Sequence, residues 1–150
     1  MNTPQGIVLK FNTTVNTLTD RLERKAKTAM ERADIDRLRQ RMNLLRKMHV
    51  AGGQAILEAS GPYLYRYSDQ ITGRDESFFM QMDVRAELGA AISREDEFAY
   101  SLIDNIKRTY AAAKQVEKDD VYRSVLSLHT DYIQYCILTG CSPERPAAPQ

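Results

Sequence analysis

The chain has 150 residues, of which 43% are hydrophobic and 27% charged, and its formal net charge is +1. A charge so close to zero excludes binding to polyanions through the overall field of the molecule, and the length predicts one globular domain over residues 1–150. No apolar run approaches the roughly 20 residues of a membrane-spanning helix, and two cysteines are too few for a disulfide framework. We therefore expect a soluble, intracellular protein.

The charge is unevenly distributed along the sequence. Residues 20–47 hold ten Lys/Arg and five Asp/Glu, a net of +5, and the remaining residues hold eleven Lys/Arg and fifteen Asp/Glu, a net of −4. A basic segment and an acidic remainder attract each other, either within one fold or between subunits.

The N-terminal third predicts one long helix. Apolar residues recur at steps of three and four, and neither Gly nor Pro occurs between Lys10 and Ala51. This pattern predicts a near-continuous, coiled-coil-like helix over residues 13–50. The preceding residues 1–12, which contain a Pro, a Gly and the apolar stretch "GIVLKF", are expected to form an extended arm.

Residues 54–140 predict a bundle of about four further helices, which makes the fold class all-α. The expected helices are 54–60 with a new start at Pro62, then 78–92, 94–117 and 120–138, with Gly140 as the final cap. The alternation of Tyr63, Tyr65 and Tyr67 leaves a short strand open as an alternative. Residues 141–150 contain three prolines and predict an extended tail.

The basic stretch "RLRQRMNLLRKMHV" at residues 37–50 could bind either nucleic acid or another protein. With Ile35, its residues Leu38, Met42, Leu45 and His49 share one narrow stripe of a helix, and arginines flank the stripe on both shoulders, where coiled coils place the charges that select partners. Leu44 and Met48 form a second small apolar patch on the far side. Tyrosine supplies large contact areas with a polar tip, which suits interfaces. We therefore predict a partner-binding set of Ile35, Leu38, Arg39, Met42, Leu45, Arg46, His49, Tyr63, Tyr65 and Tyr67.

Two alternative functions use overlapping residues. A nucleic-acid-associated protein would bind phosphates through the basic residues of segment 37–47, but a DNA-binding helix devotes a whole face to such residues and has few apolar ones. A small-molecule binder or sensor would use a tyrosine-lined pocket. The basic residues of the first alternative are Arg37, Arg39, Arg41, Arg46 and Lys47.

No residue pattern indicates catalysis, a metal site or a cofactor. His49 and His129 lack a second ligand at metal-binding spacing, and Cys136 and Cys141 have no further Cys or His cluster beside them. The acidic clusters fall where helices are expected to begin, and the helix dipole accounts for them. We expect Cys136 to be a small buried side chain and Cys141 to be a partly exposed free thiol.

Together these patterns predict a non-enzymatic structural or adaptor subunit of a larger assembly. Helix–helix contacts with other protein subunits, either copies of itself or different chains, would hold it in place. Virion components and accessory subunits of large cellular complexes both have this character.

Overall fold

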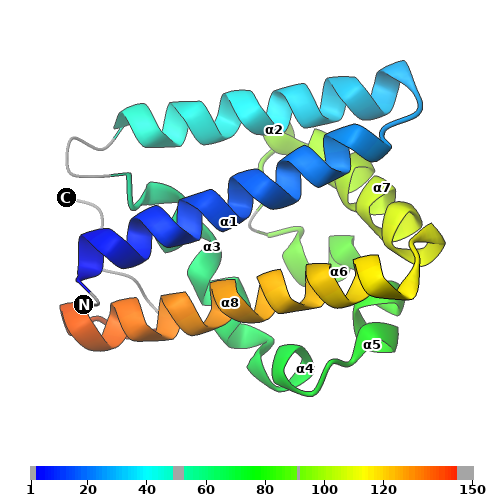
Figure 1. The fold of residues 1–150 in the computed structure, drawn as a ribbon. Coiled ribbons are helices and arrows are strands. Elements are labelled where there is room, and N and C mark those ends of the chain that lie inside the picture. Colours follow the sequence, from blue (N-terminus) through cyan, green and yellow to red (C-terminus); the bar gives the residue numbers. More distant parts are fainter. Residues whose placement is uncertain (1–2, 49–52, 91, 145–150) are drawn as a thin grey trace.

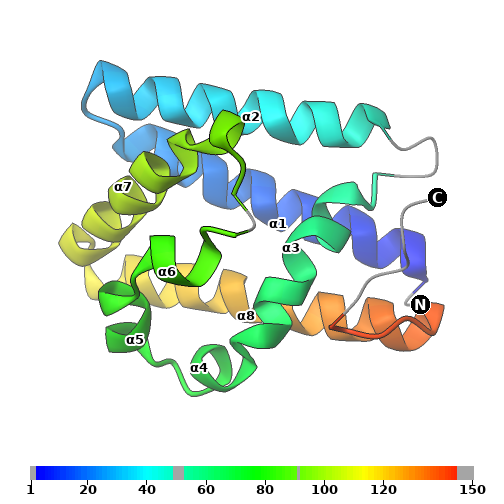
Figure 2. The same cartoon turned by 180° about the vertical axis from the view of Figure 1, so that it is seen from behind.

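The computed structural model describes residues 3–48, 53–90 and 92–144, and within these ranges the fold is all-α, as the sequence predicts. Helices α1 and α8 run side by side in opposite directions, α2 lies along the other flank of α1, and α3 crosses the bundle behind them (Figures 1 and 2). The helices are α1 (Pro4–Lys25), α2 (Ala29–Met48), α3 (Ala55–Arg66), α4 (Ser68–Thr72), α5 (Glu76–Gln81), α6 (Val84–Leu88), α7 (Phe98–Ala112) and α8 (Gln115–Thr139), with a 3-10 turn at Arg94–Asp96.

The first two helices form a hairpin, so the prediction of one continuous helix over 13–50 is wrong. Ala26 leaves the helix with φ −65° and ψ 130°, and α2 starts again three residues later. The Thr28 hydroxyl accepts the Glu31 N–H at 3.1 Å, while the Glu31 carboxylate accepts the N–H groups of Lys27 and Thr28, each at 3.0 Å. This reciprocal capping box, Thr-x-x-Glu, restarts the chain as a second helix and allows it to fold back.

The predicted N-terminal arm is also wrong for residues 4–12, which form the first turns of α1. Thr3 caps the helix by accepting the Gly6 N–H at 3.0 Å, and Pro4 occupies the first helical position. Ile7, Val8 and Phe11 from this segment are buried in the core. The apolar stretch that suggested an arm is therefore part of the chain's own packing.

Other boundaries shift as well. Ala55–Arg66 forms a single helix with Pro62 inside it, so Tyr63 and Tyr65 are helical and the strand alternative is wrong. The helix expected over 78–92 is two short ones, because Asp83 caps a new helix by accepting the Ala86 N–H. The last helix begins at Gln115 and not at Asp120, whereas Gly140 caps it in the left-handed conformation with φ 72°, as expected.

The main core lies where α1, α3 and α8 meet. Tyr132 of α8 is wholly buried, and its ring lies over Gly61 of α3 so closely that a Cβ on Gly61 would be 2.0 Å from its Cε1 atom. The absence of a side chain at Gly61 thus permits α3 to cross α8 in contact. The buried residues of this cluster are Ile7, Val8, Phe11, Met42, Ile56, Leu57, Leu128, Tyr132 and Cys136.

A second junction ties the turn between α4 and α5 to the start of α8. Arg74 donates to Glu76 at 3.0 Å and to Asp119 at 2.6 Å, and its guanidinium carbon lies 4.7 Å from the ring centre of Tyr122. These hydrogen bonds raise the pKa of Arg74, and the bond to Asp119 lowers the pKa of that carboxyl group. The pKa of Glu76 is lowered first by a hydrogen bond from the Tyr110 hydroxyl and then by the bond from Arg74. Arg74 has a φ of 50°, which the turn requires and a non-glycine residue rarely adopts.

None of the helices in the described part of the chain is both long enough and apolar enough to cross a membrane.

Replacing Gly61 by Ala should destabilise the fold by about 1–2 kcal/mol. Overpacking against Tyr132 costs about 1–3 kcal/mol, and the higher helix propensity of Ala returns up to about 1 kcal/mol. Urea unfolding followed by circular dichroism measures the difference. Gly6→Ala is the matched control, because Gly6 is exposed and its added Cβ would meet only the Thr3 hydroxyl, at 3.2 Å. If Gly61→Ala were as stable as the control, the close contact with Tyr132 would not exist.

Candidate functional site

The apolar stripe of α2 faces inward. Ile35 has no exposed surface and Met42 is 5% exposed, while Leu38 and Leu45 pack against the main core cluster. The seam predicted to face another protein is therefore filled by the chain's own helices α1, α3 and α7, and Ile35 and Met42 are not accessible to a partner in this fold. His49, the last residue of the predicted stripe, lies outside the described residues.

Two of the predicted partner-selecting arginines also act within the chain. Arg39 donates to Asp20 at 2.7 Å and pairs with Glu23 at 3.4 Å, and the hydrogen bond to Asp20 is the main cause that raises its pKa. Arg46 donates to the side-chain oxygen of Asn16 at 2.9 Å. Asp20, Glu23 and Asn16 all belong to α1, so these contacts hold α2 against α1 in the hairpin. Flanking charges hold the helices of a coiled coil together in the same way.

The opposite side of α2 is solvent-exposed, and we call it the outer surface of α2. Met30 is 71% exposed and Leu44 is 46% exposed, and both lie seven residues from Arg37, so the three side chains share one face. Leu44 was visible in the sequence as a small second apolar patch, but Met30 was missed. The exposed residues that make up this surface are Ala29, Met30, Arg32, Ala33, Asp36, Arg37, Gln40, Asn43, Leu44 and Lys47.

The outer surface of α2 is basic. Arg32, Arg37 and Lys47 form no ion pair or side-chain hydrogen bond with any described residue, and Asp36 is the single acidic residue on this surface. By contrast, Arg41 on the edge of the surface pairs with Asp96 at 3.1 Å. These cations and the exposed side chains of Met30 and Leu44 leave this surface accessible to another molecule.

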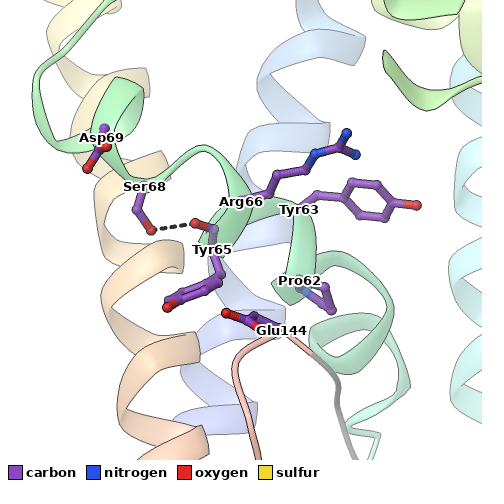
Figure 3. Close-up of a pocket in the computed structure, with 7 residues that line it drawn as sticks. All are labelled: Pro62, Tyr63, Tyr65, Arg66, Ser68, Asp69 and Glu144. Atoms are coloured by element: carbon purple, nitrogen blue, oxygen red, sulfur yellow. Dashed lines mark hydrogen bonds between the residues drawn. The ribbon is translucent and has the colours of Figure 1, made fainter. Parts of the chain in front are cut away.

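The three predicted tyrosines separate into two environments. Tyr63 and Tyr65 line an open hollow of about 650 Å³ beside α3 (Figure 3). Tyr67 instead packs against Phe78 and Phe79, with ring centres 5.7 and 6.1 Å away, and donates a hydrogen bond to Glu87 at 2.9 Å. Of the three, Tyr63 and Tyr65 thus line the hollow and Tyr67 does not.

The hollow has mixed polar and apolar walls, and the side chains that line it diverge. Tyr65 lies beside Glu144, which the C-terminal segment brings to α3, whereas Tyr63 and Arg66 extend to the other side of the helix (Figure 3). Tyr132 holds this segment by donating to the Pro143 carbonyl oxygen at 2.7 Å. Side chains that point apart do not enclose a small ligand in the way an apolar pocket does.

A serine–histidine contact at the hollow does not form an activated nucleophile. Ser68 Oγ lies 2.7 Å from His129 Nε2 and 2.7 Å from the carbonyl oxygen of Tyr65. A carbonyl oxygen only accepts, so the single hydroxyl proton goes to Tyr65 and His129 Nε2–H donates to Ser68. Burial lowers the pKa of His129, which is neutral at pH 7, but in this tautomer Nε2 cannot take the serine proton. The arrangement anchors the start of α4 to α8.

The other residues that could bind a metal ion or react, namely histidines, cysteines and carboxylates, do not lie together in the described part of the chain. The described residues contain no group of three or more His, Cys, Asp or Glu side chains that could hold a metal ion. Both cysteines are free thiols; Cys136 is buried and Cys141 is partly exposed, which confirms the sequence prediction for each.

Comparison with protein families, with curated proteins and with solved structures gives no match to this chain. The functional interpretation therefore rests on the surfaces described above.

The orientation of α2 can be tested with neighbouring residues. Leu45→Asp should lower the free energy of unfolding by about 3 kcal/mol, because it places an unpaired charge against the core. Leu44→Asp, the same change one residue away on the outer surface, should alter it by less than about 0.5 kcal/mol. Urea unfolding monitored by circular dichroism gives both values, and equal losses would mean that α2 presents a different face to the bundle.

Proposed function

We propose that this protein is a non-enzymatic structural or adaptor subunit that docks onto a larger assembly through the outer surface of α2. The partner is another protein that presents an acidic, amphipathic helix. The assembly itself is a viral particle or a large cellular complex.

The exposed heptad of Met30, Arg37 and Leu44 is the observation that carries this proposal. These side chains repeat every seven residues, which is the spacing that one helix offers to a second helix lying along it. Met and Arg are enriched at protein interfaces, and an exposed Met adapts its shape to the partner. Met30 and Leu44, with Arg32 and Arg37 between them and Lys47 beyond, fit a partner helix that carries apolar side chains at matching positions and acidic residues opposite the cations.

Charge favours a different protein over a second copy in a symmetric pair. A two-fold dimer through this surface would bring Arg37 and Lys47 of one copy toward the same residues of the other. Like charges across an interface oppose association, so the complementary partner carries acidic residues at these positions.

The same cations are the basis of the alternative, a nucleic-acid-associated protein. Phosphates would be contacted by Arg32, Arg37 and Lys47. Against this stand Met30, Leu44 and Asp36 on the same face, because a helix that follows a phosphate backbone gains nothing from exposed apolar residues or a carboxylate there.

The proposal predicts a charge-dependent interaction. Arg37→Glu combined with Lys47→Glu should weaken capture of the partner protein from an extract of the native source by roughly tenfold, with the larger effect at low salt, because both charges steer association. Bound proteins are identified by mass spectrometry, and affinity is then measured with the purified partner.

The matched control is Lys114→Glu combined with Arg94→Glu, which makes the same change of net charge at exposed sites outside α2. Equal capture by the two double variants would contradict the proposed docking surface. A parallel titration with 20-base-pair duplex DNA at physiological salt tests the alternative, since submicromolar binding lost in Arg37→Glu/Lys47→Glu would favour nucleic acid as the ligand.

A further inference from the structure

An apolar groove lies at the end of the bundle where α1 ends and α8 begins. It has a volume of about 320 Å³ and is formed by side chains of α1, α2, α7 and α8. Figure 1 shows these four helices converging at the right-hand end of the bundle, opposite the chain termini. The groove is separate from the tyrosine hollow and from the outer surface of α2.

The walls of the groove are aliphatic. Leu18 and Leu22 come from α1, Leu38 from α2, and Val121 and Val125 from α8, and none of these five side chains is fully buried. Ile106 of α7 is 42% exposed at the groove. The bundle thus leaves several aliphatic side chains accessible along one channel, at a cost in exposed apolar surface.

The rim of the groove is cationic. Arg21, Arg24 and Lys25 of α1 line it, and α8 faces them with acidic residues. Lys25 pairs with Glu117 at 2.9 Å and Arg21 pairs with Asp120 at 3.5 Å, so these two charges are largely matched. Arg24 is exposed and forms no ion pair or side-chain hydrogen bond with any described residue. One guanidinium therefore remains at the edge of the groove for a bound anion.

We propose that this groove binds an amphipathic anion with a single aliphatic chain, such as a medium-chain fatty carboxylate, with its chain along the aliphatic walls and its head group at Arg24. The volume lies at the lower end of the range of roughly 300–1,000 Å³ found for ligand pockets, which suits one chain and not a helix. The guanidinium offers paired donors that match the two oxygens of a carboxylate. The proposal does not depend on the docking function of α2.

Calorimetric titration of the purified chain of residues 1–150 with octanoate, decanoate and dodecanoate, below the micellar concentration of each, tests the proposal. Affinity should rise by about fourfold for each added methylene until the groove is filled, as expected for burial of hydrocarbon. Dodecanol, which has the chain without the charge, should bind at least several-fold more weakly than dodecanoate, and dodecyltrimethylammonium weaker still.

Two variants separate the chain contact from the head-group contact. Ala113→Phe introduces a ring at the groove from the residue that follows α7, where no helix is interrupted, and should weaken dodecanoate binding by more than tenfold. Arg24→Glu should weaken dodecanoate binding several-fold and leave dodecanol binding unchanged. Arg32→Glu, an exposed charge reversal on the outer surface of α2, should leave both unchanged.

Absence of saturable dodecanoate binding would overturn the proposal, as would binding that Ala113→Phe leaves intact. If Ala113→Phe fails to fold, methyl NMR of the wild-type chain decides the question. Dodecanoate should then shift the methyl signals of Ile106, Val121 and Val125 selectively, and shifts centred elsewhere would place the ligand outside the groove and refute the assignment.

Discussion

The packing of Tyr132 onto Gly61 is the contact on which the arrangement of the bundle depends. Tyr132 has no exposed surface, and its ring lies against α3 at Gly61, where a side chain would clash with it. This contact sets α3 against α8, and the Tyr132 hydroxyl fixes the C-terminal segment through the Pro143 carbonyl. Because burial raises the pKa of Tyr132, the phenol stays neutral and the bond to Pro143 persists across the physiological pH range.

With α1, α3 and α8 fixed around that contact, α2 completes the core with its apolar stripe. Ile35 and Met42 are buried there, and Arg39 forms an ion pair with Asp20 of α1. Among the described residues, the fold leaves unpaired cations on the outer surface of α2 and accessible aliphatic side chains in the groove at the end of α1. Leu9, Val116, Ile137 and Leu138 are exposed elsewhere on the bundle. Both proposals rest on this distinction between side chains that the fold uses and side chains that it leaves exposed.

The sequence predicts the all-α class, the apolar stripe along residues 35–45 and the burial of Cys136, because helical periodicity and side-chain hydrophobicity determine these locally. The sequence also carries the signal for a new helix, the Thr-x-x-Glu capping box of Thr28 and Glu31. This signal was missed because the apolar spacing on both sides of it is helical. The sequence does not show which helices pack against the apolar stripe of α2. The stripe has the same residue spacing whether it packs against the same chain or against a partner. The exposure of Met30 likewise depends on tertiary packing and not on local pattern.

The most direct test of this account is the solvent accessibility of two methionines on opposite sides of α2. Met42 is 5% exposed and Met30 is 71% exposed. In a sample labelled at the methionine methyl groups, assigned with Met30→Leu and Met42→Leu, a soluble gadolinium chelate should broaden the Met30 signal strongly and leave the Met42 signal nearly unchanged. Equal broadening of the two signals in the isolated chain would mean that the stripe of α2 faces solvent, and both the bundle and the docking surface described here would be wrong.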